Sequence, residues 1–190
     1  SLPHGCCPGF YNTMSQTVVN DDCLSWMSTQ SDHSIDIVVS SPPYNRGIKY
    51  NKYQDQRRDY IAWQTQVWTE VCRILKPTGH LFLNIAGNHK DPFLAYEVAR
   101  VVPWRVQNNI VWAKAIEFQG HIYGRSTVNI NAQYRLPNGH ETVWHFTHKG
   151  STSIDIEASS VPYRPEFAED NFQRTGRRTR PTTTCWHIPY

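Results

Sequence analysis

The tetrapeptide Ser41-Pro42-Pro43-Tyr44 is the segment of this sequence best suited to chemistry. Proline fixes φ and carries no N–H, so two consecutive prolines hold the neighbouring carbonyl oxygens as rigid acceptors beside the Ser41 hydroxyl. Tyr44 adds a flat aromatic face. An amino group on a planar heterocycle would donate its hydrogens to these acceptors while its ring stacks on the tyrosine. The tetrapeptide therefore indicates a site for an aromatic amine.

The elements around this tetrapeptide follow an α/β pattern. The β-branched run at residues 35–39 predicts a buried parallel strand that the two prolines end. Residues 60–75 have apolar side chains at helical spacing, and Lys76 to Gly79 would close that helix. Further strands are predicted at residues 17–20, 80–87, 106–112 and 141–147, with helices starting at residue 24 and covering 92–101. Such an order predicts a mostly parallel sheet, in which ligands bind beyond the carboxyl ends of the strands.

Two stretches lack regular periodicity. Residues 117–140 are rich in Gly, Asn and other polar types and are predicted to form a long functional loop. Residues 151–190 show little apolar periodicity. We therefore expect an α/β domain over residues 1–150 and an extended basic arm over residues 151–190.

The composition is that of a folded protein of ordinary domain size. Of 190 residues, 39% are hydrophobic, 13% aromatic and only 18% charged, which excludes a disordered chain or a coiled coil. The net charge of +3 is compatible with an anionic partner without requiring one. No apolar run approaches the ~20 residues of a membrane span, and the start lacks a secretory signal. Five irregularly spaced cysteines without a C-x-x-C pair disfavour disulfides and zinc, so a reducing cytoplasm is predicted.

The segments around the tetrapeptide resemble the amino-group DNA methyltransferases, which use S-adenosylmethionine and carry a [DNS]-P-P-[YFW] motif. The similarity covers most of residues 17–190, in the motif order that places the catalytic block first. It is carried by residues 20–45, 71–88, 106–115, 139–150 and 180–190, the last reading RPTTTCWHIPY. The resemblance implies that residues 1–150 form a catalytic domain with a Rossmann-like methyltransferase fold, in a cytoplasm of microbial or phage type. It also implies double-stranded DNA as partner, with DNA contacts from residues 113–140 and from the arm.

The resemblance also implies roles for single residues. Ser41 and the Pro42 carbonyl, held by Pro43, would accept hydrogen bonds from the exocyclic amine and lie beside the cofactor, while Tyr44 stacks on a base flipped out of the duplex. The amine would attack the sulfonium methyl directly, so orientation supplies most of the acceleration. By their place in the match, Asp22 and its neighbour Cys23 would contact the cofactor, Asp22 at the adenosine part. Serine at the first motif position favours cytosine-N4 as the target, with adenine-N6 the close alternative.

One family motif has no counterpart in this sequence. The family binds the methionine end of its cofactor on an F-x-G-x-G loop after a buried strand, and no such segment occurs here. We therefore expect an incomplete sheet and cofactor site, completed by a following segment or a second polypeptide, and self-association of the isolated chain. Two alternatives are a catalytically inactive DNA-binding remnant or subunit, and an enzyme that methylates RNA.

Basic residues flank the tetrapeptide and gather in the arm. Phosphate contacts are predicted for Asn45, Arg46, Lys49, Lys52, Arg174, Arg177, Arg178 and Arg180. The alternative is a solvated face that Glu166, Glu169 and Asp170 partly balance. His140, Glu141 and His145 do not have H-E-x-x-H spacing, and no metal site is predicted. Packing in the core or on an amphipathic face, in preference to base stacking, is predicted for Trp63, Trp68, Trp104 and Trp112.

Overall fold

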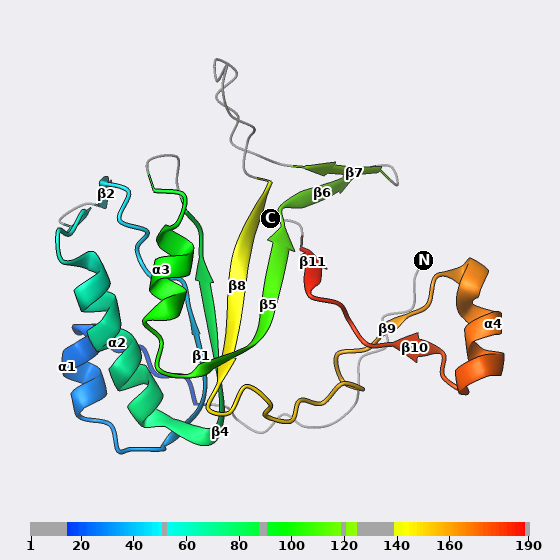
Figure 1. Ribbon diagram of the computed structural model, residues 1–190, viewed down its shortest axis with the longest axis horizontal. Coiled ribbons are helices and arrows are strands. Elements are labelled where there is room, and N and C mark those ends of the chain that lie inside the picture. Colours follow the sequence, from blue (N-terminus) through cyan, green and yellow to red (C-terminus); the bar gives the residue numbers. More distant parts are fainter. Residues whose placement is uncertain (1–14, 51–52, 88–90, 119–120, 125–138, 189–190) are drawn as a thin grey trace, which may run out of the picture.

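A computed structural model of the chain describes residues 15–50, 53–87, 91–118, 121–124 and 139–188 (Figure 1). The helices are α1 Cys23–Ser28, α2 Tyr60–Ile74, α3 Leu94–Arg100 and α4 Pro165–Thr175. The strands are β1 Ile35–Ser40, β2 Ile48–Tyr50, β3 Tyr53–Asp55, β4 Leu75–Ile85, β5 Arg105–Ala113, β6 Ala115–Phe118, β7 His121–Gly124, β8 His140–Thr147, β9 Val161–Pro162, β10 Thr179–Arg180 and β11 Cys185–His187. Strands and helices alternate through the first half of the chain, as the sequence predicts.

The central sheet is mixed and mostly parallel, which confirms the predicted fold class. Its strand order is β1-β4-β8-β5-β11. β1 pairs parallel to β4, and β11 pairs parallel to β5, while β8 runs antiparallel to both of its neighbours. The carboxyl ends of β1, β4, β5 and β11 therefore lie on one side of the sheet, and β8 begins on that side.

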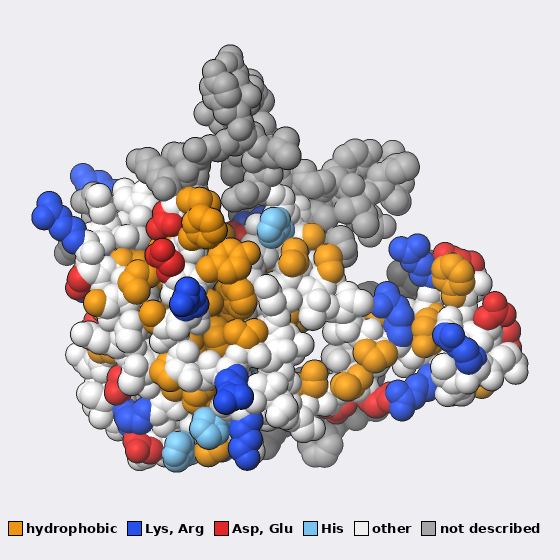
Figure 2. Space-filling model, in the orientation of Figure 1, with side chains coloured by type: hydrophobic (Ala, Val, Ile, Leu, Met, Phe, Trp, Pro, Cys, Tyr) orange, Lys and Arg blue, Asp and Glu red, His pale blue; other side chains and the backbone are white. Residues whose placement is uncertain are grey.

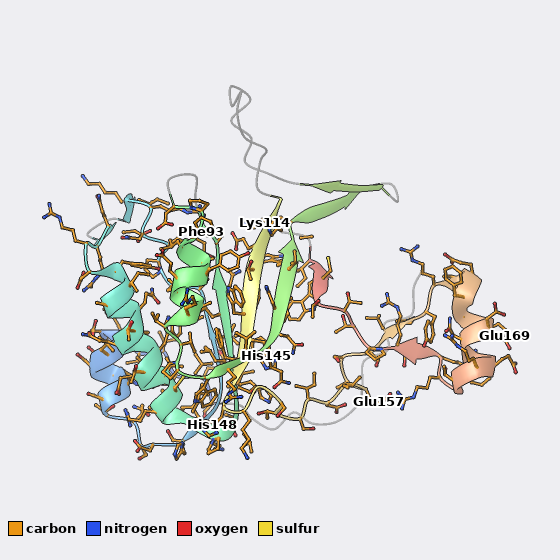
Figure 3. The ribbon with its side chains drawn as sticks, viewed as in Figure 1. Phe93, Lys114, His145, His148, Glu157 and Glu169 are labelled. Atoms are coloured by element: carbon orange, nitrogen blue, oxygen red, sulfur yellow. The ribbon has the colours of Figure 1, made fainter. Side chains whose placement is uncertain are left out.

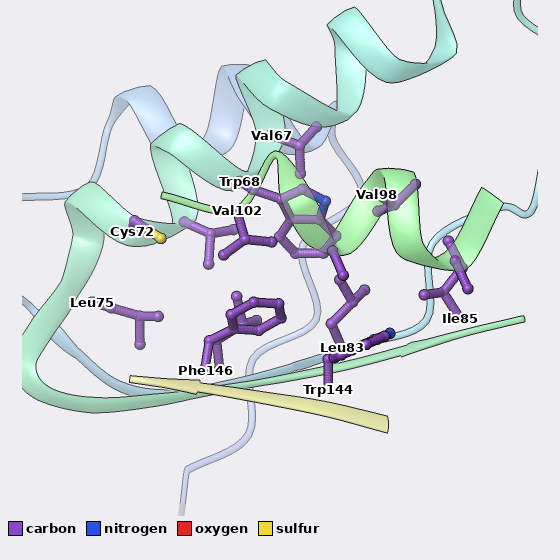
Figure 4. Packing of buried hydrophobic residues seen from close by; sticks show 14 of the residues in the cluster. Val67, Trp68, Cys72, Leu75, Leu83, Ile85, Val98, Val102, Trp144 and Phe146 are labelled. Atoms are coloured by element: carbon purple, nitrogen blue, oxygen red, sulfur yellow. The ribbon is translucent and has the colours of Figure 1, made fainter. Parts of the chain in front are cut away.

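The core lies between the sheet and the helices α1, α2 and α3. Helix α2 buries the apolar side chains that recur every three or four residues, as the period of 3.6 requires. Trp68 is 1% exposed and packs above Leu83 and Phe146, which come from β4 and β8 (Figure 4). Leu83 and Trp144 are register partners, so their side chains share this face. The helical layer thus holds the middle strands of the sheet in place.

The opposite face of the sheet is more open at β1. Val38 packs toward the helices, whereas Ile37 and Val39 point to the other face and are 53% and 75% exposed. The sequence predicts residues 35–39 as a buried strand, and this prediction of burial is wrong for Ile37 and Val39. The reason is that β1 lies at the sheet edge in the described part of the chain, where only its helix-facing side chains are covered.

The helix and strand after the first strand meet earlier than predicted. Helix α2 ends at Ile74 because Leu75, which is fully buried, is already extended with ψ 137° and pairs with Ile35 in the sheet. Lys76 to Gly79 therefore belong to β4, where the register with β1 shifts. A Cβ on Gly79 would lie 2.9 Å from the Asp36 carbonyl oxygen, so the glycine permits this close approach.

Other segments also depart from expectation. Residues 17–20 form no strand and are exposed. Part of the predicted long loop forms the antiparallel pair β6 and β7, and its residues 125–138 lie outside the described residues. The predicted arm contains α4, which begins at Pro165 and is capped by Gly176 at φ 69°, and it stands apart from the sheet in Figure 1. Among the described residues, no helix is long and apolar enough to cross a membrane.

Candidate functional site

The site lies at the carboxyl ends of β1, β4 and β5, on the side of the sheet where β8 begins. A cavity of about 650 Å³ opens there, within the roughly 300–1,000 Å³ usual for ligand pockets. Its wall combines the predicted tetrapeptide with residues from three other strands and from the β2–β3 loop region. The lining residues are Ser41, Pro42, Pro43, Tyr44, Arg46, Ile48, Asp55, Asn84, Trp112, Lys114 and Glu141.

The tetrapeptide turns its polar groups toward the end of β4. The hydroxyl oxygens of Ser41 and Tyr44 are 3.1 Å apart. Asn84 Oδ1 lies within hydrogen-bonding distance of both hydroxyls, at 2.8 Å from Tyr44 Oη and 3.3 Å from Ser41 Oγ. The Pro43 carbonyl accepts the hydroxyl of Tyr60 at 2.5 Å. This last bond ties the tetrapeptide to helix α2 and fixes its position against the core.

Tyr44 is a neutral hydrogen-bonding group over the physiological range. Burial raises the pKa of its phenol to about 12, the Ser41 hydrogen bond opposes this rise, and the nearby Glu141 carboxylate adds to it. The Tyr44 hydroxyl lies 3.4 Å from Glu141 Oε2. The phenol therefore stays protonated and keeps an O–H to donate inside the cavity.

A buried ion pair forms part of the cavity wall beside Tyr44. Lys114 Nζ lies 2.5 Å from Glu141 Oε1, and the two side chains are only 17% and 14% exposed. Lys114 also lies 5.5 Å from the ring centre of Trp112, and Figure 3 shows it near the end of β5 and the start of β8. Withdrawing two charges from water is costly, so such a pair is weak evidence for a purely stabilising role.

The loop after the tetrapeptide is held by Asp55 and Asn45. Asp55 is 2% exposed and accepts the backbone N–H groups of Asn45 at 2.8 Å and Arg46 at 3.1 Å. The Asn45 amide bonds twice to the backbone of Arg57, and its φ of 53° favours asparagine there. Asn45, predicted to contact DNA, thus has a loop-holding role. The Arg46 guanidinium lies 5.1 Å above the Tyr44 ring centre.

The other predicted contact residues lie in three places. The Asp22 carboxylate caps α1 by accepting the N–H groups of Leu24 and Ser25, and neither Asp22 nor Cys23 lines the cavity. Lys49 is exposed on β2, while Lys52 lies outside the described residues. The arginines of the arm lie on α4, β10 and the turn between them, where Figure 2 shows basic and acidic side chains intermixed. This group consists of Arg174, Arg177, Arg178 and Arg180.

Several of these arginines already have partners within the arm, and Arg174 donates to Asn171 Oδ1 at 2.7 Å. Arg177 pairs with Glu157 at 3.3 Å, and both side chains are more than half exposed. The Arg178 guanidinium lies 4.3 Å from the ring centre of Phe172. These interactions lie at the surface, where ion pairs are weak and exchange readily with other anions. The arm therefore keeps its charge accessible.

The sequence interpretation missed six residues of the cavity wall. Ile48 and Asp55 belong to β2 and β3, and the other four lie near strand ends of the central sheet: Asn84, Trp112, Lys114 and Glu141. Trp112 was predicted to pack in the core or on an amphipathic face, but it lines the cavity because it stands near the carboxyl end of β5. A signal was present in the sequence, since each of these four residues lies at the end of a predicted strand that reaches the site edge. The described residues contain no cluster of three metal-ligating side chains.

The wall fits an amine on a flat heterocycle. The hydroxyl and amide oxygens of Ser41 and Asn84 are acceptors, and the rings of Tyr44 and Trp112 border the same cavity. The residues expected beside the methyl group of S-adenosylmethionine, Ser41 and Pro42, line this cavity. The residues expected at the adenosine end, Asp22 and Cys23, lie outside the wall.

Comparison with known proteins places these residues in a family. The family model described as DNA methylase, for N6 and N4 methyltransferases, matches residues 35–190. The type II methyltransferase M.BglII of Bacillus subtilis is 27% identical over 176 residues, covering 86% of this chain and 44% of the relative. The type II methyltransferase M.MjaVI of Methanocaldococcus jannaschii is 35% identical over 104 residues, covering 50% of this chain and 53% of the relative. The chain spans about half the length of these relatives.

Solved structures share the fold at low sequence identity. PvuII DNA methyltransferase, which is cytosine-N4-specific, superposes with a TM-score of 0.59 at 18% identity, covering 89% of this chain and 55% of that one. The putative DNA modification methylase TTHA0409 of Thermus thermophilus superposes with a TM-score of 0.50 at 22% identity, covering 89% of this chain and 65% of that one. The chain thus shares the overall fold of both structures.

Proposed function

Because the chain belongs to the DNA methylase family of N6 and N4 methyltransferases and has their Rossmann-like fold, we propose that it is the catalytic part of a site-specific DNA methyltransferase. Enzymes of this family are S-adenosylmethionine-dependent. The observation that carries the proposal is the cluster of acceptors around Tyr44, at the strand ends where the cavity opens. The reaction is methyl transfer to the exocyclic amine of a base.

The chain's own residues orient the amine. Ser41 Oγ and the Pro42 carbonyl accept its two hydrogens, which draws the nitrogen lone pair out of the ring plane and toward the methyl donor. Tyr44 stacks on the base, and Tyr60 holds the Pro43 carbonyl so that the acceptors do not move. S-adenosylmethionine supplies a methyl group activated by the positive sulfur. Ser41 and Pro42 border the cofactor, and Asp22 and Cys23 contribute farther along it.

The methyl acceptor is the N4 amine of cytosine, in preference to the N6 amine of adenine. Serine, not aspartate or asparagine, stands at position 41, and this choice is the support for cytosine. An amine inside a duplex is out of reach of a cavity at a sheet edge, so the base is flipped out before transfer. The Arg46 guanidinium above the Tyr44 ring occupies a stacking position that the flipped base would take.

DNA contacts come from two basic groups. Arg46, Lys49 and Lys52 follow the tetrapeptide beside the cavity, where the strand around a flipped base would pass. The four arm arginines at positions 174, 177, 178 and 180 reach phosphates farther along the duplex. Such contacts predict an affinity that falls steeply with salt.

The open face of β1 is covered by additional polypeptide in the active enzyme. Ile37 and Val39 are β-branched, apolar and more than half exposed, and the relatives are about twice as long as the matched chain. A segment that carries the glycine-rich cofactor loop, from the same or a second polypeptide, would bury both side chains. Without it, these side chains favour self-association of the isolated chain.

An inactive DNA-binding subunit is the second candidate, because Asp22 and Cys23 lie outside the cavity wall. The deciding assay measures transfer of labelled methyl groups from S-adenosylmethionine to unmethylated duplex DNA and to RNA, followed by digestion and identification of the methylated base. It is run with the chain alone and with the glycine-rich segment supplied. N4-methylcytosine formation that Ser41→Ala abolishes supports the proposal. DNA binding without transfer under both conditions favours the inactive subunit, and transfer to RNA alone refutes the DNA substrate.

A further inference from the structure

The Ser41 hydroxyl, the Tyr44 hydroxyl and the Glu141 carboxylate lie in a row, each within hydrogen-bonding distance of the next, although Glu141 is not part of the tetrapeptide. Ser41 Oγ is 3.1 Å from Tyr44 Oη, which is 3.4 Å from Glu141 Oε2. Tyr44 Oη also approaches Asn84, at 2.8 Å from the side-chain oxygen and 3.5 Å from the backbone oxygen. Amide oxygens accept hydrogen bonds but are almost never protonated, whereas a carboxylate is far more basic and can take a proton from a stronger acid. Among these acceptors around Tyr44, Glu141 is therefore the proton acceptor.

The second carboxylate in the cavity wall serves another purpose. Both Asp55 oxygens accept backbone N–H groups of the loop at residues 45 and 46, and the side chain is 2% exposed. Glu141 divides its oxygens differently, because Oε1 contacts the Lys114 ammonium while Oε2 faces the Tyr44 hydroxyl. Lys114 thus orients the carboxylate and leaves one oxygen directed at the tetrapeptide.

We propose that Glu141 receives the proton released in methyl transfer, through the hydroxyls of Ser41 and Tyr44. The inference rests on the proposed function. The amine lone pair forms the new N–C bond, the electrons of the broken S–C bond remain on sulfur, and the nitrogen becomes positively charged. Its N–H proton moves to Ser41 Oγ, the Ser41 proton moves to Tyr44 Oη, and the Tyr44 proton moves to Glu141 Oε2. The sulfonium charge and the carboxylate charge are both neutralised, and the proton later leaves to water.

Two features of the site favour this path. An amine that is positively charged on an aromatic ring has lost its conjugation with that ring and regains it on deprotonation, so a carboxylate is basic enough even beside a lysine. Tyr44 must remain a neutral hydroxyl to relay a proton, and burial with the Glu141 charge raises its pKa to about 12. The rival interpretation is that Glu141 only partners Lys114 and shapes the cavity wall.

The first test needs neither cofactor nor DNA. 3-Fluorotyrosine is placed at position 44, and its fluorine resonance is followed against pH in the otherwise unchanged chain and in the Glu141→Gln and Lys114→Gln variants. Because the Glu141 charge disfavours the phenolate, Glu141→Gln should lower the pKa of the fluorinated phenol, and Lys114→Gln should not. An unchanged pKa in Glu141→Gln would show that the carboxylate does not contact Tyr44, and the relay would be refuted.

The second test measures single-turnover methyl transfer to duplex DNA, with the chain alone or with the glycine-rich segment supplied, whichever is active. Glu141→Gln should reduce the rate constant by roughly 10²-fold or more, as for loss of a general base, with dissociation constants for cofactor and DNA within twofold. Glu141→Asp should restore part of the rate, and Lys114→Gln should lose less than Glu141→Gln. The rate of the unsubstituted protein should fall at low pH, and this fall should disappear in Glu141→Gln.

The outcomes separate the two proposals. If the unsubstituted protein transfers no methyl group, the proposed function fails, and the relay through Glu141 fails with it whatever the fluorine titration reports. If it is active and Glu141→Gln keeps the full rate and its pH dependence, only the relay is overturned. Equal losses in Glu141→Gln and Lys114→Gln, without a change in the pH profile, would assign Glu141 a structural role and also overturn the relay.

Discussion

A buried histidine in the sheet should make the stability of this protein depend on pH. His145 on β8 is 2% exposed, and its ring stacks on Phe82 with centroids 4.4 Å apart and planes 6° apart. Nδ1 lies 2.9 Å from the Asn108 side-chain NH₂, which only donates, so Nδ1 must accept. The proton of the neutral ring therefore sits on Nε2 and is donated to His80 Nδ1 at 2.9 Å. A second proton on His145 would have to sit on Nδ1, where it would face the Asn108 NH₂ donor. The charged form of His145 is therefore disfavoured.

The magnitude follows from the shift of the His145 pKa. Burial, with the nearby His80 charge, lowers this pKa from 6.5 to about 4. Below pH 6.5 the unfolded chain protonates while the folded protein stays neutral, so acidification favours unfolding. The free energy of unfolding should fall by up to ~1.4 kcal/mol per pH unit, about 3 kcal/mol by pH 4, and level off below that. Above pH 6.5 His145 is neutral in both the folded and the unfolded chain, so its effect on the free energy of unfolding no longer changes with pH.

The assay is urea unfolding, followed by tryptophan fluorescence between pH 7 and pH 4. His145→Gln removes the titrating group, and His148→Gln is the matched control at an exposed histidine just beyond the same strand. The difference in unfolding free energy between the unsubstituted protein and His145→Gln should change by about 3 kcal/mol over this range. The same difference for His148→Gln should stay nearly flat. A pH-independent difference for His145→Gln would refute the reasoning.

Four further perturbations test the core, the site and the surface. Trp68→Ala should lower the free energy of unfolding by about 3–5 kcal/mol because it empties a buried site, whereas Gln66→Ala on the exposed side of α2 should change it by less than ~0.5 kcal/mol; similar urea midpoints would contradict this. Tyr44→Phe keeps the ring but loses the contacts of its hydroxyl, so single-turnover transfer should fall at least about tenfold with cofactor affinity, measured by calorimetry, within twofold. Arg178→Ala should reduce the slope of log affinity for DNA against log salt by about one, and an unchanged slope would exclude a phosphate contact. Val39→Lys places a charge on the open strand face, so sedimentation should show less self-association without a loss of unfolding free energy.

The sequence alone determined the features that depend on local order. The β-branched run before two prolines indicated a strand over residues 35–39, and the structure has it as Ile35–Ser40. The spacing of apolar residues indicated a helix over residues 60–75, which ends one residue earlier, at Ile74. The tetrapeptide placed acceptors and a tyrosine at a strand end. These features follow from backbone stereochemistry and side-chain periodicity within a short window, so they are readable without knowledge of distant contacts.

Only the tertiary structure decided which distant residues meet at the cavity. Asn84, Lys114 and Glu141 lie 40 to 97 residues from Tyr44 or its neighbours in the chain, and they converge because β8 runs antiparallel between β4 and β5. The same order puts β1 at an edge, which leaves Ile37 and Val39 exposed despite an apolar sequence typical of a buried strand. Strand order and burial depend on pairing between remote segments, and the free energy of such pairing is not encoded in any short stretch of the sequence.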